Sequence, residues 1–223
     1  MVSCLYSTKG QGSVINEYIY NRPFFDFSYQ LLCLYNNLKE GGFTLVENPN
    51  IILITGIMAS GKSTVAQLLS EQFDKSVHLR GDIFRRMIVN NRKEVRPDSE
   101  SDEFDQLRLR YQLAAQSAEM YYKAGYTVVV QDVVIGPLLT DFISFIKSRP
   151  FYLVVLCPNS TVVATREATR AKKGYGIWSV DELDRVLRNE TPRSGLWLDS
   201  SDLSPKETVK EIIMRLQNEA LIT

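Results

Sequence analysis

The chain has 223 residues, of which 26 are basic and 26 acidic, so its formal net charge at neutral pH is zero. This balance excludes a global electrostatic field that would hold the protein on nucleic acid or on an anionic membrane, and any basic binding surface must be local. The length has room for one α/β domain with a proper core and a smaller appendage, rather than for two full domains.

The cysteines and the apolar runs indicate where the protein works. Cys4, Cys33 and Cys157 are far apart and lack the paired spacing of a zinc site or a disulfide framework, which indicates a reducing compartment. No apolar run approaches the roughly 20 residues that span a bilayer, and the first residues lack the pattern of a signal peptide. We therefore expect a cytoplasmic protein without a membrane partner.

Residues 1–48 differ in composition from the rest of the chain. They are rich in aromatic side chains, which argues against disorder of the whole segment, and a helix is expected over residues 27–38. We expect a partly helical N-terminal extension that packs on the core, with a dimer contact or a cover over the acceptor site as the functional alternative. Residues 49–223 would then form the main domain.

A glycine loop directly after an apolar run is the most specific motif of the chain. Residues 51–55, IILIT, indicate a buried parallel strand, and residues 56–63 have the full spacing GxxxxGKS of a phosphate-binding loop. Gly56 and Gly61 let successive N–H groups point at phosphate oxygens, and the next helix offers its positive N-terminus. The order of strand, loop and helix predicts nucleoside triphosphate binding, with a chance glycine-rich turn as the alternative.

Side chains of the loop predict the individual ligand contacts. Lys62 is a cation that can span the β- and γ-phosphates, and the Ser63 hydroxyl is an oxygen ligand suited to Mg²⁺. The expected cofactors are therefore ATP and Mg²⁺. The predicted nucleotide-binding residues are Gly56, Ala59, Ser60, Gly61, Lys62, Ser63, Thr64 and, from a later helix, Arg166.

Asp82 follows a short strand expected at 77–79 and begins a short helix expected at 82–89. In a doubly wound sheet this position faces the γ-phosphate across the cleft, where a carboxylate can orient or deprotonate an acceptor hydroxyl. The alternative is that Asp82 only caps the helix. His78, the one histidine of the sequence, lies inside the strand and is expected to be a packed residue.

Basic residues are concentrated after Asp82. We predict that Arg85 and Arg86 bind the substrate, and further basic residues extend the run to Arg96, which fits an anionic acceptor. An acidic run follows at 98–105, so pairing of the two runs on a solvated surface is an equal alternative.

Asp132 closes a valine-rich strand expected at 126–131, after a helix expected at 104–122. An acid at the end of an apolar strand is typical of the Walker-B carboxylate that steadies Mg²⁺. Ser63 and Asp132 are therefore the predicted metal residues, with the alternative that Asp132 holds the acceptor. A further helix is expected at 136–148.

A basic helix expected at 160–173 and the loop that follows it indicate a lid at about 160–180. Arg166 and Arg170 are four residues apart and would share one helix face. One arginine can stabilise the moving phosphoryl group and the other can stack on adenine. The alternative is a solvated face balanced by Glu167.

Strands at 151–157 and 195–198 and two later helices complete the pattern. Capping boxes mark the starts of these helices, Ser179 with Glu182 and Ser204 with Glu207. The alternation of about five strands with helices predicts an α/β fold with a parallel sheet covered on both faces and with ligands at the carboxyl ends of the strands.

With these motifs, residues 51 to about 218 resemble the small P-loop phosphotransferases grouped around chloramphenicol phosphotransferase, with gluconate kinase and shikimate kinase as more distant relatives. The glycine loop, GDIFRR at 81–86 and GYGIWSVDEL at 174–183 support the resemblance. It implies a P-loop NTPase fold of the nucleotide-kinase type, in which the catalytic residues are Asp82 on the acceptor hydroxyl, Lys62 on the phosphates and Arg170 assisting transfer.

The leading hypothesis is therefore a kinase that moves the γ-phosphate of ATP to a hydroxyl of a small molecule, such as an antibiotic, a sugar acid or another metabolite. The spacing from Asp82 to Arg85 also fits a nucleoside or polynucleotide-end kinase, so nucleic acid is a second, weaker partner hypothesis. A third hypothesis is an ATP-binding regulatory or interaction module. The sequence does not name the acceptor, choose ATP over GTP or set the oligomeric state.

Overall fold

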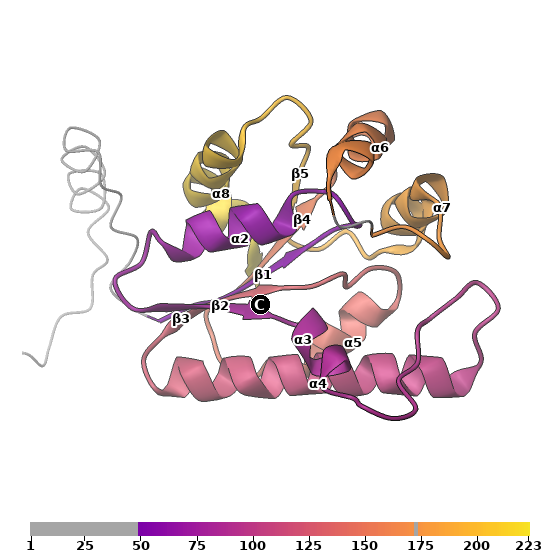
Figure 1. Cartoon of the computed structure of the whole chain (residues 1–223). Coiled ribbons are helices and arrows are strands. Elements are labelled where there is room, and N and C mark those ends of the chain that lie inside the picture. The colour runs from indigo at the N-terminus through magenta and orange to yellow at the C-terminus, as the bar shows by residue number, and fades with distance from the viewer. Residues whose placement is uncertain (1–48, 172–173) are drawn as a thin grey trace, which may run out of the picture. The chain divides into compact units, whose positions relative to one another are not determined.

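The computed structural model describes residues 49–171 and 174–223. The helix expected at 27–38 and its packing on the core lie outside the described residues, so the N-terminal extension stays a prediction. In the described part of the chain, no helix is both long and apolar enough to cross a membrane. A central sheet with helices on both sides forms this part (Figure 1).

The sheet consists of five parallel strands in the order β2-β3-β1-β4-β5. Their bounds are β1 Ile51–Thr55, β2 Ser76–Arg80, β3 Thr127–Gln131, β4 Phe151–Leu156 and β5 Leu196–Leu198. The predicted α/β fold of about five parallel strands is thus confirmed. A sixth strand, β6 (Leu221–Ile222), pairs antiparallel with the start of β4. The sequence analysis did not predict it, because two residues are too few to show a period.

Two pairs of helices cover the two faces of the sheet (Figure 1). α2 and α8 pack on one face, and α4 and α5 pack on the other. The helices are α2 Lys62–Ser70, α3 Asp82–Arg86, α4 Ser101–Lys123, α5 Leu138–Phe145, α6 Ser160–Thr169, α7 Val180–Arg185 with its π-helical continuation η1 Val186–Glu190, and α8 Pro205–Glu219.

The buried strand β1 shows why four of its five residues are apolar. Ile51 and Leu53 pack toward α4 and α5, whereas Ile52 and Ile54 pack toward α2 and α8. Successive side chains of a strand point to opposite faces, so a strand covered on both faces is apolar. The exception is Thr55 at its end, whose hydroxyl donates to the Val134 carbonyl at 2.7 Å. All five residues of β1 are buried.

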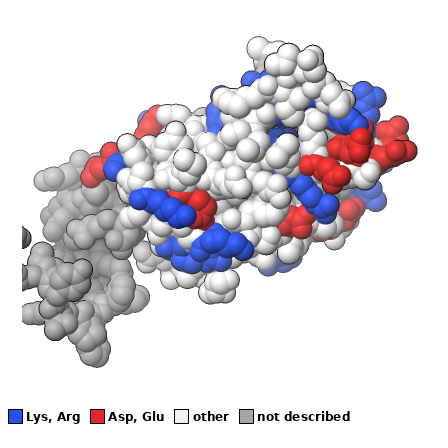
Figure 2. All heavy atoms as spheres, turned by 90° about the horizontal axis from the view of Figure 1, so that it is seen from below, with Lys and Arg blue, Asp and Glu red and all other residues white. Residues whose placement is uncertain are grey.

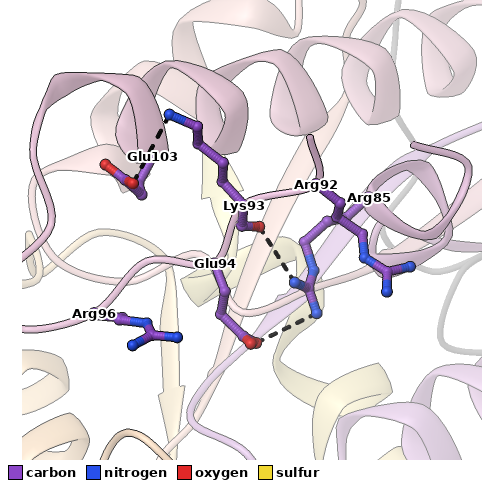
Figure 3. A pocket seen from close by; sticks show the side chains of 6 residues that line it. All are labelled: Arg85, Arg92, Lys93, Glu94, Arg96 and Glu103. Atoms are coloured by element: carbon purple, nitrogen blue, oxygen red, sulfur yellow. Dashed lines mark hydrogen bonds and ion pairs between the residues drawn. The ribbon is translucent and has the colours of Figure 1, made fainter. Parts of the chain in front are cut away.

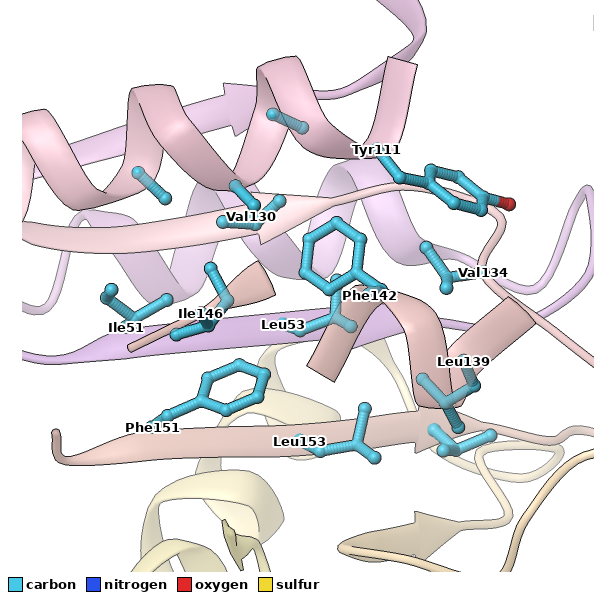
Figure 4. Close-up of a cluster of buried hydrophobic side chains, with 14 of the residues drawn as sticks. Ile51, Leu53, Tyr111, Val130, Val134, Leu139, Phe142, Ile146, Phe151 and Leu153 are labelled. Carbon is cyan, nitrogen blue, oxygen red and sulfur yellow. The ribbon is translucent and has the colours of Figure 1, made fainter. Parts of the chain in front are cut away.

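The core under α4 and α5 contains the largest buried aromatic side chains (Figure 4). Tyr111 of α4 and Phe142 of α5 meet edge to face, with ring centroids 5.8 Å apart. The Tyr111 hydroxyl donates a hydrogen bond of 2.6 Å to the Val133 carbonyl just after β3. This contact ties the helix layer to the edge of the sheet that carries the site.

Several helix bounds differ from the expected ones. α4 begins at Ser101 rather than at 104, because Glu100 and Glu103 form a capping box within the segment expected to be irregular. α6 ends at Thr169 rather than at 173, because the backbone of Arg170 is extended. α3 ends three residues early, and α5 spans 138–145 rather than 136–148. Both predicted capping boxes of the later helices are confirmed.

Truncation of Phe142 tests this core. The side chain is 0% exposed, so Phe142→Ala should lower the free energy of unfolding by about 3–5 kcal/mol in a urea titration. Met120→Ala on α4 is the control, because Met120 is 73% exposed and should change stability by no more than about 0.5 kcal/mol. Equal losses in the two variants would contradict the assignment of the core to the α4–α5 layer.

Candidate active site

Three segments that are distant in sequence end at the same edge of the sheet. The phosphate-binding loop follows β1, Asp82 follows β2, and Asp132 follows β3. The parallel pairing aligns Gln131 of β3 with Ile54 of β1 and with Arg80 of β2, so the three strand ends are level. The two aspartates and the loop are therefore brought to one edge, as the sequence predicted from strand order.

The loop between β1 and α2 has the backbone of an anion-binding nest. Gly56 has φ +142° and Gly61 has φ +96°, and Ala59 between them also has a positive φ of 60°. A Cβ at Gly56 would collide with the Leu156 carbonyl oxygen of β4, so only glycine fits there. With the start of α2 behind it, this loop directs N–H groups and a helix dipole at one point.

Lys62 is the buried cation of this loop. Its Nζ donates hydrogen bonds to the Ile57 carbonyl at 2.6 Å and to Ser60 Oγ at 3.5 Å. Burial lowers the pKa of the ammonium to about 7, and the charges of Asp132 and Asp82 oppose this shift only in part. A cation held in this way gains from any polyanion that arrives in the nest.

Two arginines also act on the pKa of Lys62. The charges of Arg170 and Arg110 lower it further, so both guanidinium groups lie close enough to the ammonium to interact with it. Asp82 and Asp132 act on this pKa in the opposite direction, so four charged side chains lie within electrostatic range of the lysine. Of these four, Arg110 was not predicted from the sequence.

Asp82 is the first residue of α3, and about a third of its side chain is exposed. Arg86 donates a hydrogen bond to its carboxylate, and Arg80 Nε lies 3.8 Å from it. The N-cap of α3 is Gly81, without a side-chain cap, so the alternative role of Asp82 as a helix cap is wrong. Arg85, also predicted to bind substrate, instead faces the loop after α3, where its NH2 group is 3.3 Å from Glu94.

Asp132 is buried and held by Arg110 of α4. The guanidinium donates two hydrogen bonds to the carboxylate, of which the one from Nε is 2.9 Å long, and the Val133 N–H donates a third at 2.7 Å. Gly81 makes room for the carboxylate, because a Cβ there would overlap with it. A charged residue next to Tyr111 in the inward stripe of α4 was the signal in the sequence that could have identified Arg110.

The predicted metal residues Ser63 and Asp132 have different neighbours. The Ser63 hydroxyl donates to Gln131 Oε1 at 3.1 Å, whereas the carboxylate of Asp132 is paired with Arg110. Hydroxyl and amide oxygens suit Mg²⁺, so Ser63 and Gln131 fit a cation next to bound phosphate. No cluster of three or more His, Cys, Asp or Glu occurs among residues 49–171 and 174–223, so phosphate and water would supply the other ligands.

The segment after α6 contacts the phosphate-binding loop directly. The Tyr175 hydroxyl donates to the Met58 carbonyl at 2.8 Å, and burial raises its pKa, so the donor stays protonated. Glu167 accepts the N–H groups of Gly174 and Tyr175 at 2.5 and 3.2 Å, which turns the chain back onto α6. Glu167 is buried and also pairs with Arg170, so this residue balances a lid arginine but does not lie on a solvated face.

The two predicted lid arginines are both near the nucleotide loop, although Arg170 is not part of the helix. Arg166 NH2 donates to the Ser200 carbonyl at 3.0 Å, and its other terminal nitrogen is 4.0 Å from where a Cβ of Gly61 would lie. Arg170 NH1 is 3.3 Å from the Glu167 carboxylate. Thr64, predicted to bind the nucleotide, is exposed in the first turn of α2. The roles of these residues stay predictions.

The comparison with protein families identifies the class of domain. A family described as AAA domain matches residues 51–189, which includes the loop, both aspartates and both lid arginines. The chain belongs to this family. A comparison with curated proteins gave no match.

Solved structures of kinases share the fold of this AAA domain. A sugar kinase from Janibacter sp. has a TM-score of 0.52 at 17% identity, over 75% of this chain and 93% of the kinase. The APS kinase CysC of Mycobacterium tuberculosis, in complex with AMPPNP and APS, and the shikimate kinase of Aquifex aeolicus each have a TM-score of 0.52 at 19% identity, over 75% of this chain and 96% of theirs. The chain therefore has a P-loop kinase-like fold.

The lowered pKa of Lys62 predicts a pH dependence of stability. Between pH 7 and about 10.4, the unfolded chain keeps the Lys62 proton that the folded, ligand-free protein has lost, so the lysine makes stability rise with pH in this window. Lys62→Met should remove that rise. In urea titrations, the unfolding free energy of the wild type minus that of the variant should therefore increase from pH 7 to 9.5. Lys206→Met, at an exposed position, is the control. Parallel curves for wild type and Lys62→Met would show an ammonium with its ordinary pKa.

Proposed function

We propose that this P-loop kinase-like domain transfers the γ-phosphate of ATP, with Mg²⁺, to a hydroxyl group of a small molecule. The observation that supports this most directly is that Asp82, partly exposed, follows β2 at the same edge of the sheet as the loop that carries Lys62. Nucleotide binding alone needs the loop and a cation. A partly exposed carboxylate opposite the cation is what an acceptor hydroxyl needs in addition.

On the donor side, each residue has a defined task. The N–H groups of residues 56–61 bind phosphate oxygens, and Lys62 exchanges the Ile57 carbonyl for an oxygen of the β- or γ-phosphate. Arg170 adds positive charge where the phosphoryl group moves, and Arg166 contacts the nucleotide beside Gly61. Mg²⁺, when bound, would add positive charge to the phosphate oxygens, and Ser63 and Gln131 are the residues that would hold it.

On the acceptor side, Asp82 accepts the proton of the hydroxyl. The hydroxyl oxygen forms the new bond to the γ-phosphorus while the bond from that phosphorus to the oxygen of ADP breaks. Arg86 holds the carboxylate of Asp82 in place. Asp132 is held by Arg110 at the adjacent strand end, where it can accept a hydrogen bond from the acceptor rather than bind the cation.

The structural neighbours support this proposal because three of them are named as kinases. Sugar kinase, shikimate kinase and APS kinase are named for small substrates, and the APS kinase structure contains AMPPNP and APS. The resemblance of GDIFRR to phosphotransferase-like proteins supports the reaction, and we propose a hydroxylated metabolite or antibiotic as the acceptor. Because ATP is the proposed donor, we place the reaction in the cytoplasm.

Replacement of Asp82 tests the proposed reaction. Wild type, Asp82→Asn and Asp141→Asn would be incubated with γ-labelled ATP, Mg²⁺ and pools of hydroxylated metabolites, nucleosides and oligonucleotides. We expect label transfer to a small molecule, a decrease of about 10²- to 10⁴-fold in kcat for Asp82→Asn, and little change in its affinity for ATP. Asp141→Asn is the matched control, because Asp141 pairs with Arg108 on the surface of α4 and α5.

Other outcomes of this assay would overturn the proposal. If Asp82→Asn transferred label at the wild-type rate, Asp82 would not be the general base. Labelled oligonucleotide ends as the only product would point to the polynucleotide-end kinase instead. Slow ATP hydrolysis without any labelled acceptor would favour a nucleotide-controlled interaction module.

Arg170→Ala separates transition-state stabilisation from nucleotide binding. Arg170 lies near Lys62 and, among residues 49–171 and 174–223, pairs with Glu167 of its own segment. The variant should therefore lose turnover, by about 10- to 1,000-fold, with less than a threefold change in the dissociation constant of ATP. Steady-state kinetics and fluorescence titration with a labelled ATP analogue would measure the two quantities. Equal losses in both would make Arg170 a binding residue.

A further inference from the structure

The loop that connects α3 to α4 forms a pocket of about 440 Å³ beside the acceptor side of the site (Figure 3). The pocket is lined by Arg85, Arg92, Lys93, Glu94, Arg96 and Glu103. In the view from below, basic and acidic side chains gather at the right-hand end of the molecule, where Figure 1 places this loop (Figure 2). Four of the six lining residues are cations, so the pocket is positively charged despite the neutral chain.

Hydrogen bonds from three other elements hold the loop in shape. Gln106 of α4 accepts the Lys93 N–H at 2.6 Å and donates to the Asn91 carbonyl at 3.1 Å. Arg85 of α3 donates to the Lys93 carbonyl at 3.3 Å. From the segment after α6, Trp178 Nε1 donates to the Val95 carbonyl at 2.9 Å. Backbone contacts of this kind fix the positions from which the basic side chains extend.

The cations of the pocket are compensated unequally. Arg85 pairs with Glu94 at 3.3 Å, and Lys93 pairs with Asp102 at 2.8 Å. Arg92 and Arg96 have neither an ion pair nor a hydrogen bond from their guanidinium groups within the described part of the chain. Arg92 and Arg96 are exposed and extend to different sides of the Arg85–Glu94 pair (Figure 3), so each is open to an anion that enters the pocket. Their planar N–H donors match the paired oxygens of a carboxylate or a phosphate.

The position of the pocket connects it to the proposed reaction. Arg85 is three residues after Asp82 on α3, so the two side chains are neighbours on one helix face. Trp178 joins the same loop to the segment whose Tyr175 contacts the phosphate-binding loop. The loop that forms the pocket is therefore joined to the helix that carries the proposed base and to the lid segment.

We propose that this pocket binds the acceptor by an anionic group, a carboxylate or a phosphate, held by Arg92 or by Arg96, with the acceptor hydroxyl directed toward Asp82 on the adjoining helix α3. The proposal rests on the proposed kinase function for the role of the acceptor. The presence of an anion site does not rest on it. The acceptor class is thus a hydroxylated acid or a phosphate ester, and a neutral polyol or amide would lack the group that the pocket binds.

Anion binding is tested first, without catalysis. The full-length protein would be saturated with Mg²⁺ and ADP to fill the phosphate-binding loop and then titrated calorimetrically with inorganic phosphate or with malonate. We expect binding of at least one anion and a loss of about tenfold or more in the double variant Arg92→Ala/Arg96→Ala. The order of the two affinities distinguishes a phosphate-bearing from a carboxylate-bearing acceptor.

The control for this titration removes two cations elsewhere. Lys206→Ala/Lys210→Ala changes the charge by the same amount on exposed positions of α8, on the opposite face of the sheet, and should bind the anions as the wild type does. An equal loss in both double variants would show only a general charge effect and would overturn the proposal. A wild type that binds neither phosphate nor malonate would also overturn the proposal.

Catalysis is tested next with pairs of acceptors that differ in charge, such as gluconate with glucose and a nucleoside 3′-phosphate with its nucleoside. We expect the wild type to prefer the anionic member, and the Arg92→Ala/Arg96→Ala variant to lose about tenfold or more in kcat/KM for it, without loss of acceptor-free ATP hydrolysis. A preference for neutral acceptors would overturn the acceptor assignment. Anion binding without transfer to any acceptor would instead overturn the kinase function and leave the pocket an anion site of another role.

Discussion

The ammonium group of Lys62 is a charge that the fold places out of water before any ligand is present. A single carbonyl and a serine hydroxyl satisfy it in the free protein, and burial lowers its pKa to about 7. This is a costly arrangement that a polyphosphate relieves, and the other charges of the site are disposed around it. The charges of the site lie near Lys62 because β1, β2 and β3 end at the same level, and one part of the site follows each strand.

The two aspartates of the site differ in exposure and in their partners, and this difference supports the separate roles that we propose for them. Asp132 is enclosed, with Arg110 and a backbone N–H as fixed partners, and Gly81 leaves just enough space for it. Asp82 is partly exposed and is held by a surface arginine on its own helix. A carboxylate that must receive a proton from an arriving hydroxyl needs the second kind of environment, whereas the first kind positions groups and contributes a fixed charge.

The sequence predicted those parts of the molecule that depend on chain order and periodicity. The glycine loop, the parallel sheet and the strand-end positions of Asp82 and Asp132 followed from motifs whose geometry is local or repeated. Arg110 was not predicted, since a helical stripe shows which face is buried but not which charged neighbour will meet a carboxylate from another element. Likewise, charge composition predicted that α6 continues to 173, and the contacts of Glu167 with Gly174 and Tyr175 end it at Thr169.

The hydrogen bond from Trp178 to the Val95 carbonyl joins the loop after α3 to the segment that rests on the phosphate-binding loop. If the two segments move as one body, occupancy of either site alters the affinity of the other by the same factor, as thermodynamic linkage requires. With the two ligands that we propose, the Trp178 indole would be a link between their sites, and because it contacts the backbone carbonyl of Val95, this link would not require a valine side chain.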